Sequence, residues 1–461
     1  MAIQRRTIER LSAEDALMLW PDETWPQDVG ALVLLEGDRL LDADGRFRIE
    51  AVRAAVAARL HLVPRFRQLL AVPPRSLGGP LWVDAPRFDI ADHIRQLPLP
   101  EAADESDLLL ATEGLRRRRL DRSRPLWEMW FLTGLRDRRV GLFVRFHHAI
   151  ADGMAGIATI SMLLDTDADA PAGVPVAWSP VPRPSAADLL ADERLHRWER
   201  RRARLARLRH PGTAGRRLVA GWPAMRELLA EPAYPVTSLD RLVGQDRTLA
   251  LLRARLDPLK EVAHAHDATV NDVFLTAVAG GLRALLAERG EPVEDAVLGV
   301  YVAVSLHRGE RSQARGNLIS QMVVPLPICV TNPVTRLREI ATITARRKAR
   351  QRPSLGGMPH RGFAGRLFLK LLARQHVNVM TADLPGPTEP LYLAGARLLE
   401  VFPMVQLIGR NSLVVGALSY AGNFGVMAVA DRDAYPDLEV FRAGMLETVT
   451  SLLSAPAGAT R

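Results

Sequence analysis

The chain has 461 residues, 48% of them hydrophobic and 25% charged. This is about three times the commonest domain length, which argues against one small domain and predicts two domains or one large two-lobed unit. A net charge of +9, from 61 Lys and Arg against 52 Asp and Glu, permits attraction to nucleic acid, an anionic membrane or a phosphorylated small molecule and selects none of them.

The first half of the chain contains a predicted strand followed closely by a predicted helix. Residues 140–146 are apolar apart from Arg145, and residues 154–164 repeat apolar side chains at helical spacing. His147 and His148 lie in the tight connection between them, and Asp152 and Gly153 follow. Because such a connection can hold side chains rigidly at a cavity edge, it is the first candidate site.

A first lobe of residues 1–168 is expected to end in the acidic, turn-rich stretch 165–175. Residues 169–237 then form a linker rich in proline and arginine. Within it, Leu195, Trp198, Leu205 and Leu208 recur at helical spacing among eight arginines, which predicts an amphipathic helix. Two interpretations stay open: a solvated connecting helix, or a helix that docks to an anionic membrane or lipid-droplet surface.

The second lobe is expected to cover residues 238–461. Its predicted helices are 256–266 and 270–289, and its predicted strands are 297–306, 321–326, 412–419 and 425–430. Strands and helices therefore alternate in both lobes, which favours an α/β or α+β fold over an all-helical one.

The adjacent histidines can support proton transfer. A neutral imidazole, with an ordinary pKa of about 6.5, is a competent base for an alcohol near neutral pH. Adjacent side chains at a strand end point in opposite directions, so one histidine can face a reaction while the other packs beneath it. From the residues alone a structural pair remains an alternative, and so does zinc binding with Asp152, although no third histidine or cysteine stands at ligand spacing.

Cysteine usage and hydropathy bear on location. Cys329 is the one cysteine, which excludes an intrachain disulfide and a cysteine-based zinc site. The N-terminus lacks the apolar segment of a signal peptide, and no run of about 20 apolar residues is present. We expect a cytoplasmic protein, with peripheral contact to the inner membrane face or lipid inclusions left open.

The pattern His-His-x-x-x-Asp-Gly at residues 147–153 is similar to the active-site signature of the superfamily containing chloramphenicol acetyltransferase, carnitine acyltransferases and peptide-synthetase condensation domains. Over nearly its whole length, the chain more closely resembles the bacterial bifunctional wax ester synthase/acyl-CoA:diacylglycerol acyltransferase family. The matching segments, in order, are 11–16, 63–67, 80–84, 88–90, 120–128, 147–153, 269–273, 302–306, 316–317, 384–387, 391–396 and 419–422.

This resemblance implies two chloramphenicol-acetyltransferase-like lobes, each a mixed sheet flanked by helices, with an active-site tunnel between them. By the same resemblance, His148 matches the catalytic base and His147 its supporting neighbour. Asp152 matches a structural aspartate of the motif, and Gly153 matches the glycine that leaves the substrate channel open.

Two further motifs are implied to lie near the substrates. Pro125, Leu126 and Trp127 match a family motif near the lobe junction, and Asn271 and Asp272 match one close to the active site from the second lobe. The residue chemistry leaves alternatives open: core packing for Trp127 and helix capping for Asp272.

The implied activity is acyl-CoA-dependent O-acyl transfer. A long-chain fatty acyl group would move from its CoA thioester to diacylglycerol, giving triacylglycerol, or to a long-chain alcohol, giving a wax ester. No acyl-enzyme, metal or cofactor is expected, since acyl-CoA is itself the substrate. The sequence contains no Gly-x-Ser-x-Gly element, which argues against a serine nucleophile. It also contains no nucleic-acid recognition motif.

Several positions depart from the family pattern. Gln27 and Asp28 replace a usual Met-His, Ala303 replaces a proline, His307 replaces an arginine, and Asp383 replaces an asparagine. These departures keep two alternatives open: an acyltransferase for a specialised acceptor such as a polyketide, glycolipid or amine, or a catalytically weak lipid-binding homologue.

Overall fold

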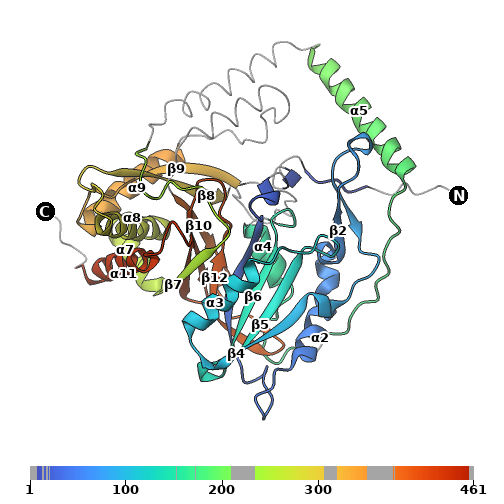
Figure 1. Cartoon of the computed structure of the whole chain (residues 1–461), viewed down its shortest axis with the longest axis horizontal. Coiled ribbons are helices and arrows are strands. Elements are labelled where there is room, and N and C mark those ends of the chain that lie inside the picture. The colour runs from blue at the N-terminus through green and yellow to red at the C-terminus, as the bar shows by residue number, and fades with distance from the viewer. Residues whose placement is uncertain are drawn as a thin grey trace.

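The computed structural model describes residues 8–12, 15–16, 19, 21–151, 153–171, 173–208, 234–305, 319–349, 377 and 379–455. Within these ranges, two six-stranded mixed sheets form the frame of the molecule, with helices packed against them (Figure 1). A separate two-stranded sheet, β2 (Gln68–Ala71) with β3 (Leu81–Asp84), lies at one side.

The first sheet has the strand order β11-β12-β1-β6-β5-β4. Its strands are β1 (Asp28–Glu36), β4 (Ile94–Ala103), β5 (Trp127–Leu135), β6 (Arg139–His147), β11 (Tyr392–Leu393) and β12 (Ala396–Met404). Helices α2 (Ile49–Arg59) and α4 (Gly153–Ser161) bury apolar side chains against one face, and α3 (Glu105–Arg116) packs on the other. The central strands β1 and β6 are almost wholly apolar because both faces are covered.

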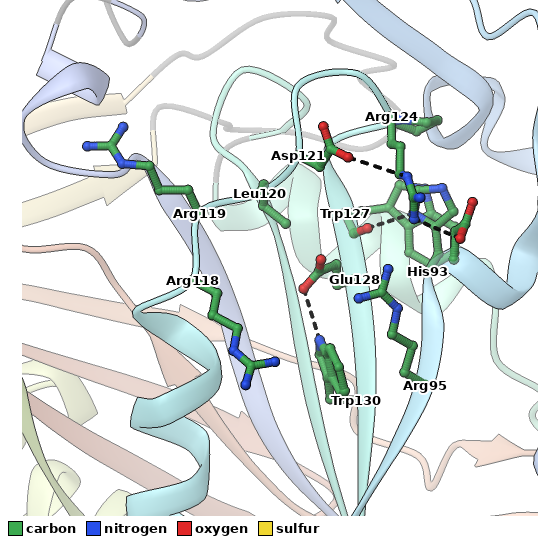
Figure 2. A pocket seen from close by; sticks show the side chains of 12 residues that line it. His93, Arg95, Arg118, Arg119, Leu120, Asp121, Arg124, Trp127, Glu128 and Trp130 are labelled. Carbon is green, nitrogen blue, oxygen red and sulfur yellow. Dashed lines mark hydrogen bonds and ion pairs between the residues drawn. The ribbon is translucent and has the colours of Figure 1, made fainter.

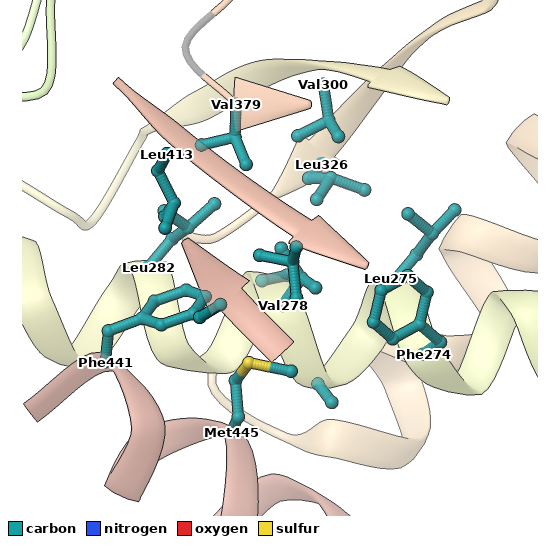
Figure 3. Packing of buried hydrophobic residues seen from close by; sticks show 14 of the residues in the cluster. Phe274, Leu275, Val278, Leu282, Val300, Leu326, Val379, Leu413, Phe441 and Met445 are labelled. Carbon is teal, nitrogen blue, oxygen red and sulfur yellow. The ribbon is translucent and has the colours of Figure 1, made fainter. Parts of the chain in front are cut away.

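The second sheet has the order β7-β14-β13-β10-β8-β9. Its strands are β7 (Arg247–Arg255), β8 (Val297–Ser305), β9 (Ile319–Pro327), β10 (Val379–Pro385), β13 (Leu413–Tyr420) and β14 (Asn423–Asp431). Helices α7 (Leu256–Ala265), α8 (Val270–Glu288), α9 (Pro333–Ala349) and α11 (Leu438–Ser454) cover one face. Figure 3 shows Val278 and Leu282 of α8 packed between the sheet and Phe441 and Met445 of α11.

Helix α8 is apolar enough and long enough to cross a membrane, with a mean hydropathy of 1.4. In the fold it is the central helix of the second core, and 72% of that apolar window is buried inside the protein. Burial between a sheet and a second helix accounts for its composition without a bilayer. Among the described residues, no other helix meets the same criteria of length and hydropathy.

Strand β12 connects the two halves of the molecule. It belongs to the sequence region expected to form the second lobe, 238–461, yet it pairs along its length with β1 of the first sheet, where Val33 faces Val401. Arg253 of β7 adds an ion pair to Glu400 of β12 at 2.9 Å. The expected division into domains at 1–168, 169–237 and 238–461 stays a prediction. The first sheet takes β11 and β12 from the region 238–461, so the boundaries of the two sheets differ from that division.

The local predictions largely match the elements. The strand expected at 140–146 is β6, the helix expected at 154–164 is α4, and the arginine-rich helix is α5 (Ala186–Leu208). The helices expected at 256–266 and 270–289 are α7 and α8. The strands expected in the second lobe are β8, β9, β13 and β14.

Candidate active site

The histidine pair lies where β6 ends, and two neighbouring segments fix its backbone. The amide of His147 donates to the carbonyl of Leu126 at 2.9 Å, and the amide of His148 donates to the carbonyl of Gln27 at 2.8 Å. The amide of Ile150 returns to the carbonyl of His147 at 2.8 Å and closes a turn before α4. These backbone hydrogen bonds connect the histidine motif to the Pro-Leu-Trp segment and to Gln27, one of the positions that differ from the family pattern.

Both ring nitrogens of His147 face protein groups. Nδ1 accepts the amide N–H of Ala149 at 3.0 Å, so this nitrogen carries no proton. The proton then sits on Nε2, which lies 3.3 Å from Oδ1 of Asp22. Both side chains are buried, with His147 2% and Asp22 5% exposed. Nε2 makes no hydrogen bond among the described residues, so its contact with Asp22 is electrostatic, and the ring of His147 holds the turn through Nδ1.

Asp22 connects this turn to the loop that precedes β5. Its Oδ1 also accepts the amide of Gln27 at 2.7 Å, and its Oδ2 forms an ion pair with Arg122. Burial alone would raise the pKa of the Asp22 carboxyl. The contacts with His147, the Gln27 amide and Arg122 outweigh burial and hold that pKa well below its usual range. Asp22 is thus an anion at neutral pH, facing the protonated nitrogen of His147.

A buried ion-pair network lies beneath the histidine strand. Arg145 is 2% exposed and contacts Oδ2 of Asp28 at 3.3 Å and Oε2 of Glu128 at 3.0 Å. It also donates to the carbonyl of Arg116 at 3.1 Å. Burial raises the pKa of Asp28, although the guanidinium of Arg145 opposes the shift. Asp28 is the cross-strand partner of His147 in the β1–β6 register, so this departure has a structural partner in Arg145.

The side chain of Trp127 lies in the first core. It is fully buried, donates its indole N–H to the carbonyl of Phe66 at 2.8 Å, and stacks on the rings of Phe66 at 4.6 Å and His93 at 4.5 Å. What the Pro-Leu-Trp segment brings to the histidines is the carbonyl of Leu126. The substrate-binding role expected for Pro125, Leu126 and Trp127 stays a prediction.

Asp272 caps helix α8. One carboxylate oxygen, Oδ2, accepts the amide of Thr269 at 2.8 Å and its hydroxyl at 2.7 Å, and the other, Oδ1, accepts the hydroxyl of Thr344 of α9 at 2.6 Å. The residue is 2% exposed. These contacts give Asp272 a structural function in the second lobe, and the substrate-binding role expected for Asn271 and Asp272 remains a prediction.

Helix α4 begins at Gly153 and approaches strand β10. A Cβ atom on Gly153 would lie 3.3 Å from a methyl carbon of Leu384, so a side chain there would crowd this contact. The preceding residue of the motif, Asp152, and the departure His307 lie outside the described residues. Asp383, next to Leu384, has a pKa raised to about 6 by burial. The ionisable carboxyl of Asp383 thus lies next in the chain to Leu384, the residue that contacts Gly153 of the histidine motif.

Two pockets that share Arg119 and Leu120 open beside the Pro-Leu-Trp segment. One, of about 270 Å³, is lined by His147, Asp22, Pro26, Asp28, Arg119, Leu120, Arg122 and Leu126. The other, of about 290 Å³, contains Arg95, Arg118, Arg119 and Arg124 (Figure 2). Its three carboxylates, Asp92, Asp121 and Glu128, offset most of that positive charge, and His148 lines neither pocket.

Metal binding has no support in the part of the chain that the structure describes. No group of three or more His, Cys, Asp or Glu side chains is placed there to hold an ion. Nδ1 of His147 instead accepts the amide of Ala149, and Nε2 faces Asp22.

Two family models match the sequence: the wax ester synthase/diacylglycerol acyltransferase catalytic domain over residues 11–274, and the WS/DGAT C-terminal domain over residues 315–452. The chain belongs to the wax ester synthase/diacylglycerol acyltransferase family. Like the family, it is an acyltransferase, as its sequence predicts.

Relatives of this WS/DGAT chain match along most of its length. The probable diacylglycerol O-acyltransferase tgs1 of Mycobacterium tuberculosis is 30% identical over 450 residues, which cover 92% of this chain and 91% of the relative. A putative diacylglycerol O-acyltransferase of the same organism is 31% identical over 465 residues, covering 97% and 90%.

Solved structures confirm the predicted fold class of this family member. The wax ester synthase/diacylglycerol acyltransferase from Marinobacter aquaeolei VT8 superposes with a TM-score of 0.70 at 22% identity, covering 96% of this chain and 98% of that one. The first condensation domain of the CDA synthetase gives 0.63 at 15% identity, covering 99% and 98%. At these identities the similarity establishes the fold that the two chains share.

Proposed function

We propose that this WS/DGAT chain transfers a long-chain fatty acyl group from its CoA thioester to diacylglycerol, to a long-chain alcohol, or to both. The family assignment and the diacylglycerol O-acyltransferase relatives support this choice of substrates. Acyl-CoA is a substrate and no cofactor takes part. The products are a triacylglycerol or a wax ester and free CoA.

His148 is the general base in this proposal. The observation that carries it is that the ring of His147 is turned into the protein, where Nδ1 accepts the amide of Ala149 and Nε2 faces the buried carboxylate of Asp22. The amide of His148 is held by the carbonyl of Gln27. A general base acts best when its backbone is rigid and its pKa lies near the working pH.

The reaction needs no covalent enzyme intermediate. Nε2 or Nδ1 of His148 takes the hydroxyl proton as the acceptor oxygen attacks the thioester carbonyl. The tetrahedral intermediate then expels CoA thiolate as the carbon–sulfur bond breaks. Protonated His148 returns its proton to that thiolate, so the free enzyme, the ester and CoA thiol are regenerated.

The test is thiol release from palmitoyl-CoA with hexadecanol, diacylglycerol or a short-chain alcohol as acceptor. His148→Ala should reduce turnover by roughly 100-fold or more, the usual contribution of a general base, while acyl-CoA binding is retained. His147→Ala should lower both turnover and the melting temperature, because His147 connects the turn to Asp22. Ester formation by His148→Ala at the parent rate would overturn the assignment.

An acyltransferase for a specialised acceptor is the second candidate. It is favoured by Asp383, an ionisable group in place of the family's asparagine, beside the contact between Leu384 and α4. A specialised enzyme should release thiol from acyl-CoA with an amine or glycolipid acceptor and fail with diacylglycerol and hexadecanol. A chain that binds acyl-CoA but releases no thiol with any acceptor would be a lipid-binding homologue.

A further inference from the structure

Helix α5 is attached to the protein through its first turns. Leu189 is 8% exposed and packs with Leu81 and Val83 of the small sheet, and Asp192 forms an ion pair with Arg10 at 2.7 Å. In Figure 1 the helix extends from the region of β2 away from both large sheets. These contacts fix which side of α5 faces the protein, and they leave its later turns projecting.

The side of α5 that faces away from the protein carries an apolar stripe. Leu195, Trp198 and Leu205 are 44%, 56% and 60% exposed. An α-helix turns about 100° per residue, so Trp198, nine residues after Leu189, lies about half a turn round the helix from the anchored side. Leu195 and Leu205 lie three and seven residues from Trp198 and therefore on the same side as Trp198.

Arginines flank this stripe. Arg194 and Arg202 stand four residues before and after Trp198, and Arg201 stands three residues after it, so all three lie beside the tryptophan. The guanidinium of Arg202 lies 5.3 Å from the ring centre of Trp198. Within the described ranges, none of the three forms a salt bridge, so their charges stay available to a partner.

Two other arginines of α5 share one carboxylate of the protein. Arg197 and Arg200 contact Oε1 of Glu193 at 2.8 and 2.9 Å, and the hydrogen bond from Arg197 lowers the pKa of Glu193 despite an opposing effect of burial. Of these five arginines, the three that form no salt bridge within the described ranges are thus the ones beside Trp198.

We infer that the outward face of α5, defined by Arg194, Leu195, Trp198, Arg201, Arg202 and Leu205, docks on an anionic phospholipid surface. Leucine and tryptophan would enter the boundary between headgroups and acyl chains, and the arginines would meet lipid phosphates. A second copy of the chain fits poorly, because two positively charged faces would meet. Nucleic acid would attract the arginines and leave the apolar stripe exposed.

The test is co-sedimentation of the full chain with vesicles of phosphatidylcholine alone or with added phosphatidylglycerol. The parent should bind the anionic vesicles and lose binding as salt rises. Arg194→Glu/Arg201→Glu/Arg202→Glu should weaken the affinity roughly 100-fold, because each basic residue near such a surface contributes about fivefold. Trp198→Ser/Leu205→Ser should weaken it at least about tenfold and keep the salt dependence.

A matched control separates this face from overall charge. Arg46→Glu/Arg87→Glu/Arg241→Glu changes the net charge equally at exposed arginines elsewhere and should bind nearly as the parent does. Equal losses in both triple variants, or no vesicle binding by the parent, would overturn the proposal. The proposal would also be overturned if the Arg194/Arg201/Arg202 variant bound vesicles as the parent does and lost binding to an oligonucleotide. Binding is measured without turnover, so failure of the proposed reaction would leave this result unaffected.

Discussion

Asp22 shows how one buried side chain can organise a site from outside its motif. Its carboxylate contacts the ring of His147, the amide of Gln27 and the guanidinium of Arg122. Three stretches of chain, far apart in sequence, thus meet at two oxygen atoms. Because His147 is bonded directly to His148 along the chain, the position of the proposed base depends on this carboxylate.

Asp22→Asn tests that dependence. The amide keeps the shape and the oxygen that accepts the Gln27 N–H, and it removes the negative charge facing Nε2 of His147. We expect kcat to fall about tenfold, the lower end for loss of a group that orients a functional residue, with KM for acyl-CoA nearly unchanged. The measurement is steady-state kinetics of thiol release, together with the melting temperature.

Arg122→Gln is the matched control, because Arg122 is 49% exposed and its removal leaves the contact between Asp22 and His147 in place. It should change kcat less than Asp22→Asn does. If Asp22→Asn kept the parent kcat, or lost activity only in proportion to unfolding, Asp22 would have no positioning function.

Asp383 gives a prediction about pH and stability. Burial raises its pKa from 3.8 to about 6, so the folded state holds this proton more tightly than the unfolded state. The stabilising contribution of the protonated carboxyl is complete below about pH 4 and is lost as the pH rises through about 6. Asp383→Asn should therefore match the parent near pH 4 and exceed its free energy of unfolding above pH 7 by up to about 3 kcal/mol.

Urea unfolding across this pH range measures the difference, with Asp295→Asn, an exposed position, as the control. A difference between Asp383→Asn and the parent that stayed constant with pH would show that the carboxyl is not shifted. The control should follow the parent at every pH.

Among the elements, local patterning made the strands and helices predictable. The apolar run before His147 and the helical spacing after Gly153 determine β6 and α4 through side-chain burial on known periods. The cap of α8 was also readable, since Thr269 with Asp272 three residues later is a capping box. What local patterns do not encode is which strands become neighbours.

Thr269→Ala tests the α8 cap. The threonine hydroxyl accepts the amide of Asp272 at 3.3 Å and donates to its carboxylate at 2.7 Å. Its loss should lower the free energy of unfolding by about 1 kcal/mol, the typical cost of removing a cap. Urea unfolding measures it, with Thr342→Ala on the exposed side of α9 as the control. No loss in Thr269→Ala would contradict the cap.

The site was predictable only where the motif is contiguous. His147 and His148 stand out because they end an apolar run, and Arg145 stands out because it interrupts one. Asp22 carries no such signal, since its side-chain partners Arg122 and His147 lie 100 residues or more further along the chain. Its role emerges only when the β1–β6 register brings residue 28 opposite His147.

For the whole molecule, the placement of β12 makes the two sheets interdependent. Phe402 of β12 is fully buried in a core that also contains Leu251 of β7 and Met427 of β14, so one side chain belongs to the packing of both sheets. Arg253 of β7 further contacts Glu400 of β12 and Glu105 of α3. We therefore expect the two sheets to unfold together.

The aromatic residues allow a direct test. All eight tryptophans lie between residues 20 and 222, and all five tyrosines lie between 234 and 435, with Tyr392 in β11 of the first sheet and the other four outside that sheet. Tryptophan fluorescence and tyrosine near-ultraviolet absorbance should therefore give one shared urea midpoint, as expected for a cooperative unit. Phe402→Ala should lower the free energy of unfolding by about 3 to 5 kcal/mol and should lower the urea midpoints of both signals together. Two separate midpoints in the parent would show independent lobes.

The same strand has a consequence for how the protein is made. Strand β1 ends at residue 36 and its partner β12 begins at residue 396, so about 360 residues of synthesis separate them. At roughly 5 to 20 residues per second, one edge of β1 waits about 20 to 70 seconds for its neighbour. An apolar, unpaired strand edge is a site for aggregation. The nascent chain should thus need protection, by the ribosome or a chaperone, until nearly all of its length has emerged.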